Sequence, residues 1–181
     1  MTLGTMVSNG GEIVKSGITP QELYENRKSW HNYDCFNARQ MAMALEVPLE
    51  TAHKVWQLHC ENGISSVNYT DKNYPQCFRN IPDAPLVLFY KGDITKLENE
   101  HRAGVVGSRH PDRDGIKICE DICTQLAQNS VTLISGLAQG MDSIAHICAL
   151  KENADTVAFI GTSADKYYPA ANKKLQQEIE N

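Results

Sequence analysis

Residues 102–136 read RAGVVGSRHPDRDGIKICEDICTQLAQNSVTLISG, and this stretch decides the fold class. An apolar run ends in Gly-Ser-Arg, a pattern of period 3.6 follows, and a second apolar run ends again in glycine. A strand, a helix and another strand in this order are typical of a parallel sheet with right-handed crossover helices. We therefore expect an α/β fold built on a parallel sheet.

The same alternation continues on both sides of this stretch. We expect strands over 86–92, 102–108, 131–136 and 155–162, and helices over 114–130, over 141–153 and from 170 onward. The run at 102–108 is continuously apolar, which predicts a strand buried on both faces.

The N-terminal part has a different, helical pattern. Residues 19–22 form a capping box with Pro20 at the first helical position, and further helices are expected over 37–47 and 48–63. Ala52, Val55, Trp56 and His59 share one face, which predicts a small packing bundle; a helix-turn-helix reader of DNA is the alternative. Residues 1–18 have a composition typical of disorder. We therefore expect a helical region over 1–65 and an α/β domain over 66–181.

Composition narrows the class of protein. The chain has 181 residues and a net charge of −5, which argues against a generally basic nucleic-acid binder but not against a local basic patch. It has no apolar run of membrane-spanning length and no secretory signal, so we expect a cytoplasmic protein. The six cysteines form no Cys-x-x-Cys pair. We expect most of them to be small buried hydrophobes, with Cys119 and Cys123 packing beside Ile116, Ile122 and Leu126.

Three successive strands are expected to end in turns rich in glycine and hydroxyl groups. Ligands of such sheets lie beyond the carboxyl ends of the strands, where free N–H groups at helix N-termini favour anions. An arginine in the first turn can grip a phosphate with its planar fork. A phosphate site is therefore predicted; the alternative is that the glycines only make tight turns. The predicted contacts are Gly107, Ser108, Arg109, Ser135, Gly136, Gly140, Gly161, Thr162 and Ser163.

Other chemistries receive less support from the sequence. There is no Gly-x-Gly-x-x-Gly fingerprint after the first strand and no Walker lysine, so no cofactor is expected. Asp142 and His146 are one helical turn apart and could form an acid–base pair. We favour a structural role, in which Asp142 orients the turn and His146 is packed and hydrogen-bonded, because no nucleophile is evident beside them.

Four motifs together resemble the DprA/Smf family, the DNA-processing protein A of natural transformation. They are YPQCFRNIPDAPLVLFYKGD, GVVGSRHPDRDG, LISGLAQGMDSIAHICAL and VAFIGTSADKYYPAANKKL, in the order and spacing of the family. The resemblance implies a Rossmann-like fold, binding of single-stranded DNA, loading of a RecA-type recombinase, and no catalysis. By position it makes Arg109 the main phosphate contact and places His146 after the second turn and Asn172 after Tyr168-Pro169.

This sequence also departs from the family pattern. Ala170 stands where many members have a lysine, so Lys173 and Lys174 are expected to supply the charge, with Lys166 beyond the third turn. The later strands are absent, so the chain is expected to end inside the domain. The resemblance still implies a RecA-type recombinase and a second copy of the chain as partners, although the family's contacts with them are associated with that later part. A small-nucleotide binder, a phosphoribohydrolase-type enzyme and an inactive fragment are the alternatives. Only Tyr167 and Tyr168 are aromatic near the turns, so base stacking is expected to add little.

Overall fold

The computed structural model describes residues 17, 20–32, 38–46, 48–82 and 84–181. The chain divides into two compact units, Thr5–Leu88 and Phe89–Asn181. This division lies further along the chain than the boundary at 65/66 that the sequence suggested. No helix in the described ranges is long and apolar enough to cross a membrane.

The first unit begins with the predicted helices. Pro20 is the first residue of α2, whereas Thr19 and the segment 1–16 lie outside the described residues. Gly63, with φ +66°, follows the end of the last long helix, as a glycine that terminates a helix should. The helical elements are α2 (Pro20–Glu25), η1 (Arg27–Asn32), α3 (Ala38–Glu46), α4 (Leu49–Glu61) and the short α5 (Gln76–Arg79).

The predicted packing face of α4 is not buried. Val55 and Trp56 are 45% and 51% exposed, and α4 contributes no buried residue. The expected packing of this face is therefore wrong for the described residues. The spacing of apolar residues indicates that a helix has an apolar face, but it does not indicate whether another element packs against that face.

The chain has a small two-stranded sheet that the sequence did not predict. It consists of β1 (Ser65–Asn68) and β2 (Val87–Tyr90). The strand expected over 86–92 thus exists, but it pairs with β1 and not with the parallel sheet. A buried hydrogen bond stabilises the connection between the two strands, because the Tyr74 hydroxyl donates to the Pro85 carbonyl at 2.6 Å.

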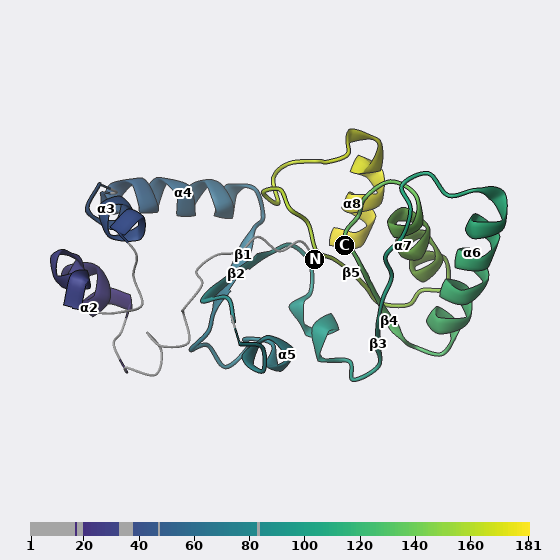
Figure 1. Ribbon diagram of the computed structural model, residues 1–181, viewed down its shortest axis with the longest axis horizontal. Coiled ribbons are helices and arrows are strands. Elements are labelled where there is room, and N and C mark those ends of the chain that lie inside the picture. Colours follow the sequence, from purple (N-terminus) through teal and green to yellow (C-terminus); the bar gives the residue numbers. More distant parts are fainter. Residues whose placement is uncertain (1–16, 18–19, 33–37, 47, 83) are drawn as a thin grey trace. The chain divides into compact units, whose positions relative to one another are not determined.

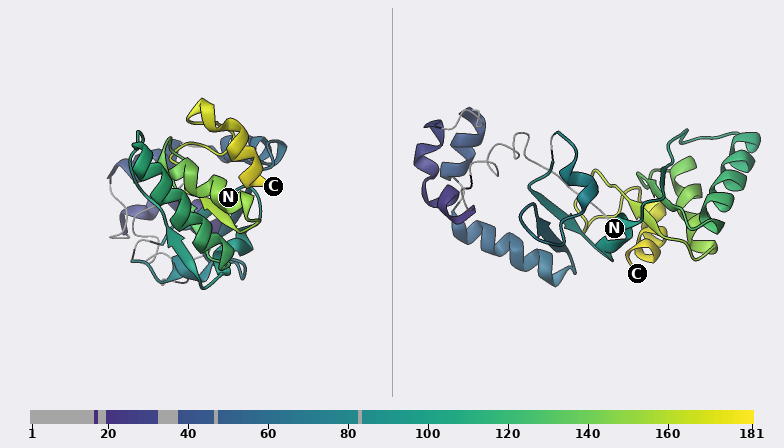
Figure 2. Two further views of the ribbon diagram at one scale, coloured as in Figure 1. Left: turned by 90° about the vertical axis from the view of Figure 1, so that its right-hand side faces the viewer. Right: turned by 90° about the horizontal axis from the view of Figure 1, so that it is seen from below.

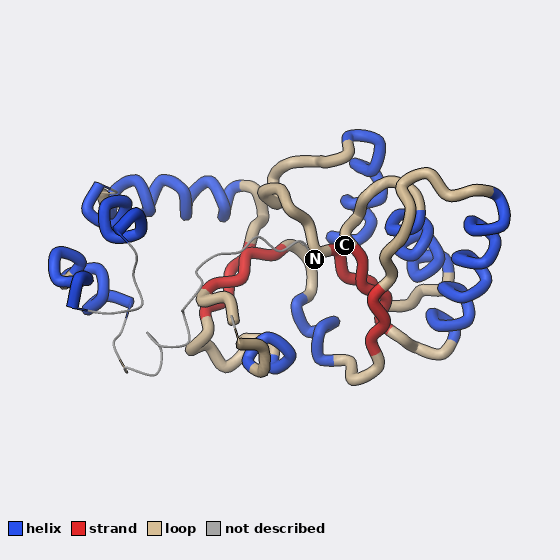
Figure 3. The backbone as a smooth tube through the Cα atoms, in the orientation of Figure 1, coloured by secondary structure: helices blue, strands red, loops and turns tan. Residues whose placement is uncertain are grey.

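The second unit contains the predicted parallel sheet. Its strands are β3 (Arg102–Gly104), β4 (Thr132–Ser135) and β5 (Thr156–Ala158), in the order β3-β4-β5 (Figures 1 and 3). Both pairs are parallel, with Gly104 opposite Ile134 and Ser135 opposite Ala158. The predicted α/β class with a Rossmann-like parallel sheet is confirmed.

The first strand of this sheet is shorter and more exposed than expected. Only Arg102–Gly104 is strand, with two of its three residues exposed, and Val106 is 88% exposed. The prediction of a strand buried on both faces is therefore wrong for β3. The physical reason is its place in the sheet: β3 pairs with β4 alone and is an edge strand, whereas β4 lies between two neighbours.

Helices pack around the sheet as Figure 2 shows, with α6 and α7 side by side, both against β4, and α8 against β5. Asp112 caps α6 by accepting from the Gly115 N–H at 2.7 Å. The remaining elements are η2 (Ile94–Glu98), α6 (Arg113–Gln128), α7 (Met141–Lys151), η3 (Ala170–Asn172) and α8 (Lys173–Glu180).

Cysteines form part of the core between α6, α7 and β4. Cys119, Cys123 and Cys148 are buried there together with Leu133, as expected of small hydrophobes. The expectation fails elsewhere. Ile122 is 53% exposed, because it lies on the outer side of α6, and Cys60 is also exposed on the uncovered helix α4. Cys77 is half-buried, and Cys35 lies outside the described residues.

Candidate nucleic-acid interface

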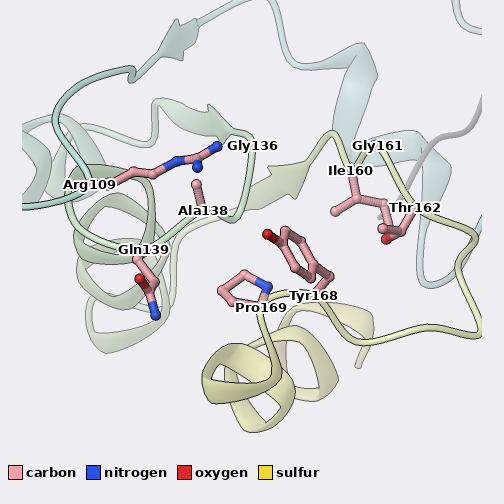
Figure 4. Close-up of a pocket in the computed structure, with 9 residues that line it drawn as sticks. All are labelled: Arg109, Gly136, Ala138, Gln139, Ile160, Gly161, Thr162, Tyr168 and Pro169. Carbon is pink, nitrogen blue, oxygen red and sulfur yellow. The ribbon is translucent and has the colours of Figure 1, made fainter.

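The turns that follow β3, β4 and β5 border one cavity of about 300 Å³. Because the three strands are parallel and adjacent, their carboxyl ends lie at the same edge of the sheet, where ligands of such folds bind. Figure 4 shows the lining side chains. They are Arg109, Gly136, Ala138, Gln139, Ile160, Gly161, Thr162, Tyr168 and Pro169.

The structure brings only some of the predicted contacts to this cavity. Arg109, Gly136, Gly161 and Thr162 line it. Ser135 does not, because it is buried and its hydroxyl donates to the Val105 carbonyl at 2.7 Å. The other predicted contacts that are not among the lining residues are Gly107, Ser108, Gly140, Ser163, Lys166, Lys173 and Lys174.

Arg109 is exposed and its guanidinium lies over Ala138, next to Gly136 (Figure 4). Within the part of the chain that the structure describes, it forms no salt bridge. A pairing with Asp112 or Asp142, which would make Arg109 a structural residue, is therefore not seen. The side chain brings an unpaired positive charge to the edge of the cavity.

The turn after β4, residues 136–140, holds the turn after β3, residues 107–109, in place. Gly140 has φ +81°, and a Cβ on it would overlap the Ser108 carbonyl oxygen and come within 2.8 Å of the Arg109 carbonyl carbon. The next residue, Met141, donates its N–H to the Ser108 oxygen at 3.1 Å. Gly140 and Met141 thus set the position of the backbone that carries the Arg109 side chain.

The second turn is also rigid in itself. Leu137 has φ +59°, which is uncommon for a residue other than glycine. Its side chain is fully buried, and its carbonyl accepts from the Asn172 Nδ2 at 2.9 Å. Asn172 therefore supports the site from η3 and does not itself line the cavity.

The Asp142 carboxylate accepts hydrogen bonds from two backbone amides of the turn after β4. Its Oδ2 accepts from the Gly136 N–H at 3.1 Å and from the Ala138 N–H at 3.3 Å. The N–H of Gly136, a predicted phosphate contact, is therefore already engaged by a carboxylate. A negative ligand near this turn would depend on Arg109, because the Asp142 carboxylate already takes the place of an anion there.

His146 belongs to the core. It is fully buried, its Nδ1 lies 2.7 Å from the Thr156 hydroxyl, and that hydroxyl donates to the Leu133 carbonyl at 2.8 Å. The Thr156 oxygen must then accept from His146, so this pattern assigns the proton to Nδ1. Burial lowers the pKa of His146 to about 4, although the nearby Asp142 acts in the opposite direction. The structural role favoured from the sequence agrees with these contacts.

The third turn and its lysines are engaged in local contacts. A hydrogen bond from the Ser163 side chain keeps the pKa of Asp165 below its usual range, so Ser163 faces a carboxylate. Lys166 pairs with Asp165 at 3.5 Å. Lys173 lies 4.9 Å from the centre of the Tyr167 ring. The positive charge expected from these residues therefore lies outside the cavity lining.

Sequence reasoning did not include Ile160, Tyr168 and Pro169 among the contacts. The Tyr-Pro pair stood out as a motif, but its approach to the first turn depends on the loop that returns from β5. Ile160 follows β5 directly and looks like any core residue in sequence. No local signal marks it as part of a cavity wall.

A model of the family described as DNA recombination-mediator protein A matches residues 65–181. The chain is 42% identical over 182 residues to DNA processing protein DprA of Streptococcus pneumoniae, and this match covers 94% of this chain and 63% of that protein. It is 31% identical over 126 residues to DprA of Bacillus subtilis, and this match covers 70% of this chain and 42% of that protein. The chain thus spans less than two thirds of the length of these relatives.

Two solved structures are similar to the fold. The X-ray structure of DprA from Streptococcus pneumoniae superposes with a TM-score of 0.61 and 32% identity, over 94% of this chain and 63% of that one. The structure of DNA processing protein A from Helicobacter pylori, which concerns the single-stranded DNA binding mode of that protein, superposes with a TM-score of 0.58 and 30% identity. That match covers 65% of this chain and 52% of the other.

Proposed function

Because the chain belongs to the DNA recombination-mediator protein A family, which includes the DprA and Smf proteins, we propose that it binds single-stranded DNA through its phosphates at the cavity beside Arg109. The observation that carries the proposal is the exposed Arg109 guanidinium at the carboxyl edge of the parallel sheet, which forms no salt bridge with any residue that the structure describes. A planar guanidinium matches a phosphate with two parallel hydrogen bonds.

The proposed role is binding and not catalysis. The sequence offered Asp142 and His146 as an acid–base pair. In the structure Asp142 accepts hydrogen bonds from two amides of the turn after β4, and His146 is fully buried. Neither residue is among those that line the cavity. Among the described residues that line the cavity, Arg109 is the one that carries a charge, which supports a binding site.

On the strength of the family, we also propose that the strand-bound protein loads a RecA-type recombinase during natural transformation and that it acts in the cytoplasm as a homodimer. The loading step is tested by measuring whether the chain speeds recombinase assembly on single-stranded DNA. The homodimer is tested by sedimentation. A monomer that binds DNA without affecting the recombinase would reject both parts and leave DNA binding intact.

Replacing Arg109 with alanine is expected to weaken binding of a labelled oligo-dT by roughly 1.5–3 kcal/mol, the range for a hydrogen bond to a charged group. Arg109→Lys should restore only part of the affinity, because an ammonium keeps the charge without the planar fork. Fluorescence anisotropy measures the affinity. Arg113→Ala is the matched control, since Arg113 is also exposed but does not line the cavity.

The thermal stability of Arg109→Ala should match that of the wild type, because an exposed arginine outside a salt bridge contributes little to folding. Loss of stability with unchanged DNA affinity would instead assign Arg109 a structural role and reject the proposal.

Binding should weaken as salt increases, because phosphate contacts release counterions. Affinity should be similar for different base sequences, because phosphates carry no base information. In titrations at several salt concentrations, Arg109→Ala should reduce the slope of log affinity against log salt by about one contact. Affinity that does not change with salt would contradict a phosphate-based mode.

A further inference from the structure

One side of the second unit exposes both the edge of β3 and a row of apolar side chains on α6. β3 is an edge strand, and α6 lies at the end of a row of helices, because α7 packs against both α6 and α8 (Figure 2). Exposed apolar surface of this kind marks sites of protein association. We propose that a second copy of this chain binds here through β3 and α6. The inference rests on the proposed homodimer and names its interface.

The open edge of β3 presents backbone groups without a strand partner. Val105 donates its N–H to the Ile134 carbonyl at 2.8 Å, so the backbone groups of Val105 point toward β4. These groups alternate along a parallel strand, and those of Arg102, Gly104 and Val106 therefore point away from β4. In the ranges that the structure describes, no second strand pairs with this edge. Such an edge is a template for a strand of another chain.

The apolar row lies on the flank of α6 that faces away from α7. The Cys148 thiol of α7 donates to the Glu120 carbonyl of α6 at 3.9 Å. Ile118 and Ile122 are each two residues from Glu120, which places them about 200° around the helix from it. They are 58% and 53% exposed, and Val106, just beyond β3, is 88% exposed. These three side chains therefore offer apolar surface that α7 does not cover.

The strand edge and the apolar row belong to one side, because α6 lies over β3. Ala103 of β3 and Val105 just beyond it pack against the core cluster that includes Cys119 and Cys123 of α6. A partner strand that pairs with β3 would therefore bring its own covering helix against the flank of α6.

A second copy fits this side because both features are self-complementary. Two β3 strands that run antiparallel about a twofold axis at Gly104 pair Arg102 of each copy with Val106 of the other. The two three-stranded sheets then form one continuous sheet. The same axis brings the two α6 helices side by side and antiparallel, so that Ile118 of each copy meets Ile122 of the other.

The charges beside the apolar row also favour a copy of the same chain. Lys117 and Asp121 are exposed and lie four residues apart on the solvent side of the row. Neither forms a salt bridge with another described residue. In the antiparallel pair of α6 helices, Lys117 of each copy faces Asp121 of the other. An unrelated strand could pair with β3, but it would not bring these opposite charges to α6.

This arrangement leaves the proposed DNA site accessible. The antiparallel seam directs the carboxyl ends of the two β3 strands toward opposite edges of the continuous sheet. Each Arg109 cavity lies at the carboxyl edge of its own sheet, so the two cavities open away from the seam. Variants that break the interface should therefore keep their affinity for oligo-dT.

Sedimentation equilibrium of the full chain measures the dissociation constant of the dimer. Ile122→Glu places a charge in the apolar row and should raise this constant at least about tenfold, the effect of losing one well-buried interface contact. Ile118→Glu should do the same, and both positions are exposed, so the fold is kept. Leu58→Glu is the matched control, because Leu58 is 55% exposed on α4 and lies outside the proposed interface.

Amide hydrogen exchange, followed by NMR, tests the strand pairing itself. The N–H groups of Arg102 and Gly104 should exchange more slowly as the protein concentration rises, because they become hydrogen-bonded across the seam. Ile122→Glu should abolish this dependence on concentration. Val106→Pro removes one N–H from the open edge but none that β4 uses, so it should weaken the dimer and keep the monomer folded.

The outcomes separate this interface from the other proposals. A monomer at the concentrations used for the DNA titrations would overturn both the interface and the homodimer, and would leave DNA binding intact. A dimer that survives Ile122→Glu and is lost in Leu58→Glu would lie at α4, which overturns this interface but not the homodimer. A dimer in which the exchange of the Gly104 amide does not depend on concentration would overturn the pairing of the two β3 strands.

Discussion

Replacing Gly140 with alanine is expected to lower the free energy of unfolding by about 3 kcal/mol or more, since strained backbone and steric overlap add up at one position. The residue has φ +81°, a region that residues with a Cβ rarely adopt. The added Cβ would also meet the Ser108 carbonyl oxygen and come within 2.8 Å of the Arg109 backbone. These are backbone atoms, so a change of rotamer cannot relieve the overlap.

Gly104→Ala is the matched control for this prediction. Gly104 has no heavy atom within 4 Å of an added Cβ, and its φ is not positive. Both substitutions change the entropy of the unfolded chain alike, so their difference isolates the strain in the folded state. Chemical denaturation measures both. Equal stability of the two variants would show that the second turn can move away from the first without cost.

Gly140→Ala should also weaken DNA binding in whatever fraction stays folded. The closest atoms belong to Ser108 and Arg109, so relief of the overlap must shift the backbone that carries the guanidinium. Anisotropy titrations of the folded variant at low temperature measure this effect. Unchanged affinity would mean that the position of the Arg109 side chain does not depend on the packing between the two turns.

Acidification is expected to destabilise the second unit between about pH 6.5 and pH 4. The pKa of His146 falls from 6.5 to about 4 on folding, because the ring is buried. In this window the unfolded chain binds the proton and the folded chain does not, so stability decreases as the pH falls. The two values correspond to a loss of about 3 kcal/mol when the window has been crossed. Above pH 6.5 this residue contributes no pH dependence.

Denaturation at several pH values measures this loss. His146→Gln removes the titrating group and should flatten the profile, whereas the exposed control His101→Gln should leave it unchanged. The lowered pKa values of Asp93 and Asp165 act below their usual value of 3.8 and so outside this window. Constant stability of the wild type from pH 7.5 to 4.5 would contradict the assignment of a buried neutral His146.

Local patterns were enough to predict much of the second unit. The period of 3.6 over residues 114–130 and the apolar runs before and after it depend only on neighbouring residues, and the structure has α6, β3 and β4 there. The glycine-rich turns at the strand ends were predictable for the same reason. Parallel strands then bring those turns to one edge, so the place of the site followed from the order of the elements.

The pairing of β1 with β2 could not be read in the same way. Ser-Ser-Val-Asn has little of the apolar alternation that marks a strand, and its partner lies beyond a connection that includes α5. The exposure of β3 was equally hidden, because a continuous apolar run looks the same in a central strand and at an edge. Both features depend on which neighbour is present and not on the local sequence.

The sequence by itself determined the α/β alternation, the helix boundaries set by proline and glycine, and the family to which the motifs belong. Only the tertiary structure decided which polar groups are available to a ligand. Asp142 occupies the Gly136 and Ala138 amides, and Asn172 reaches back to Leu137 across 35 positions of the chain. Periodicity and turn chemistry are local, whereas the satisfaction of a hydrogen-bonding group depends on contacts between distant segments. For that reason Arg109 could be predicted as a phosphate contact from its motif, whereas the position of Tyr168 at the same cavity could not be predicted.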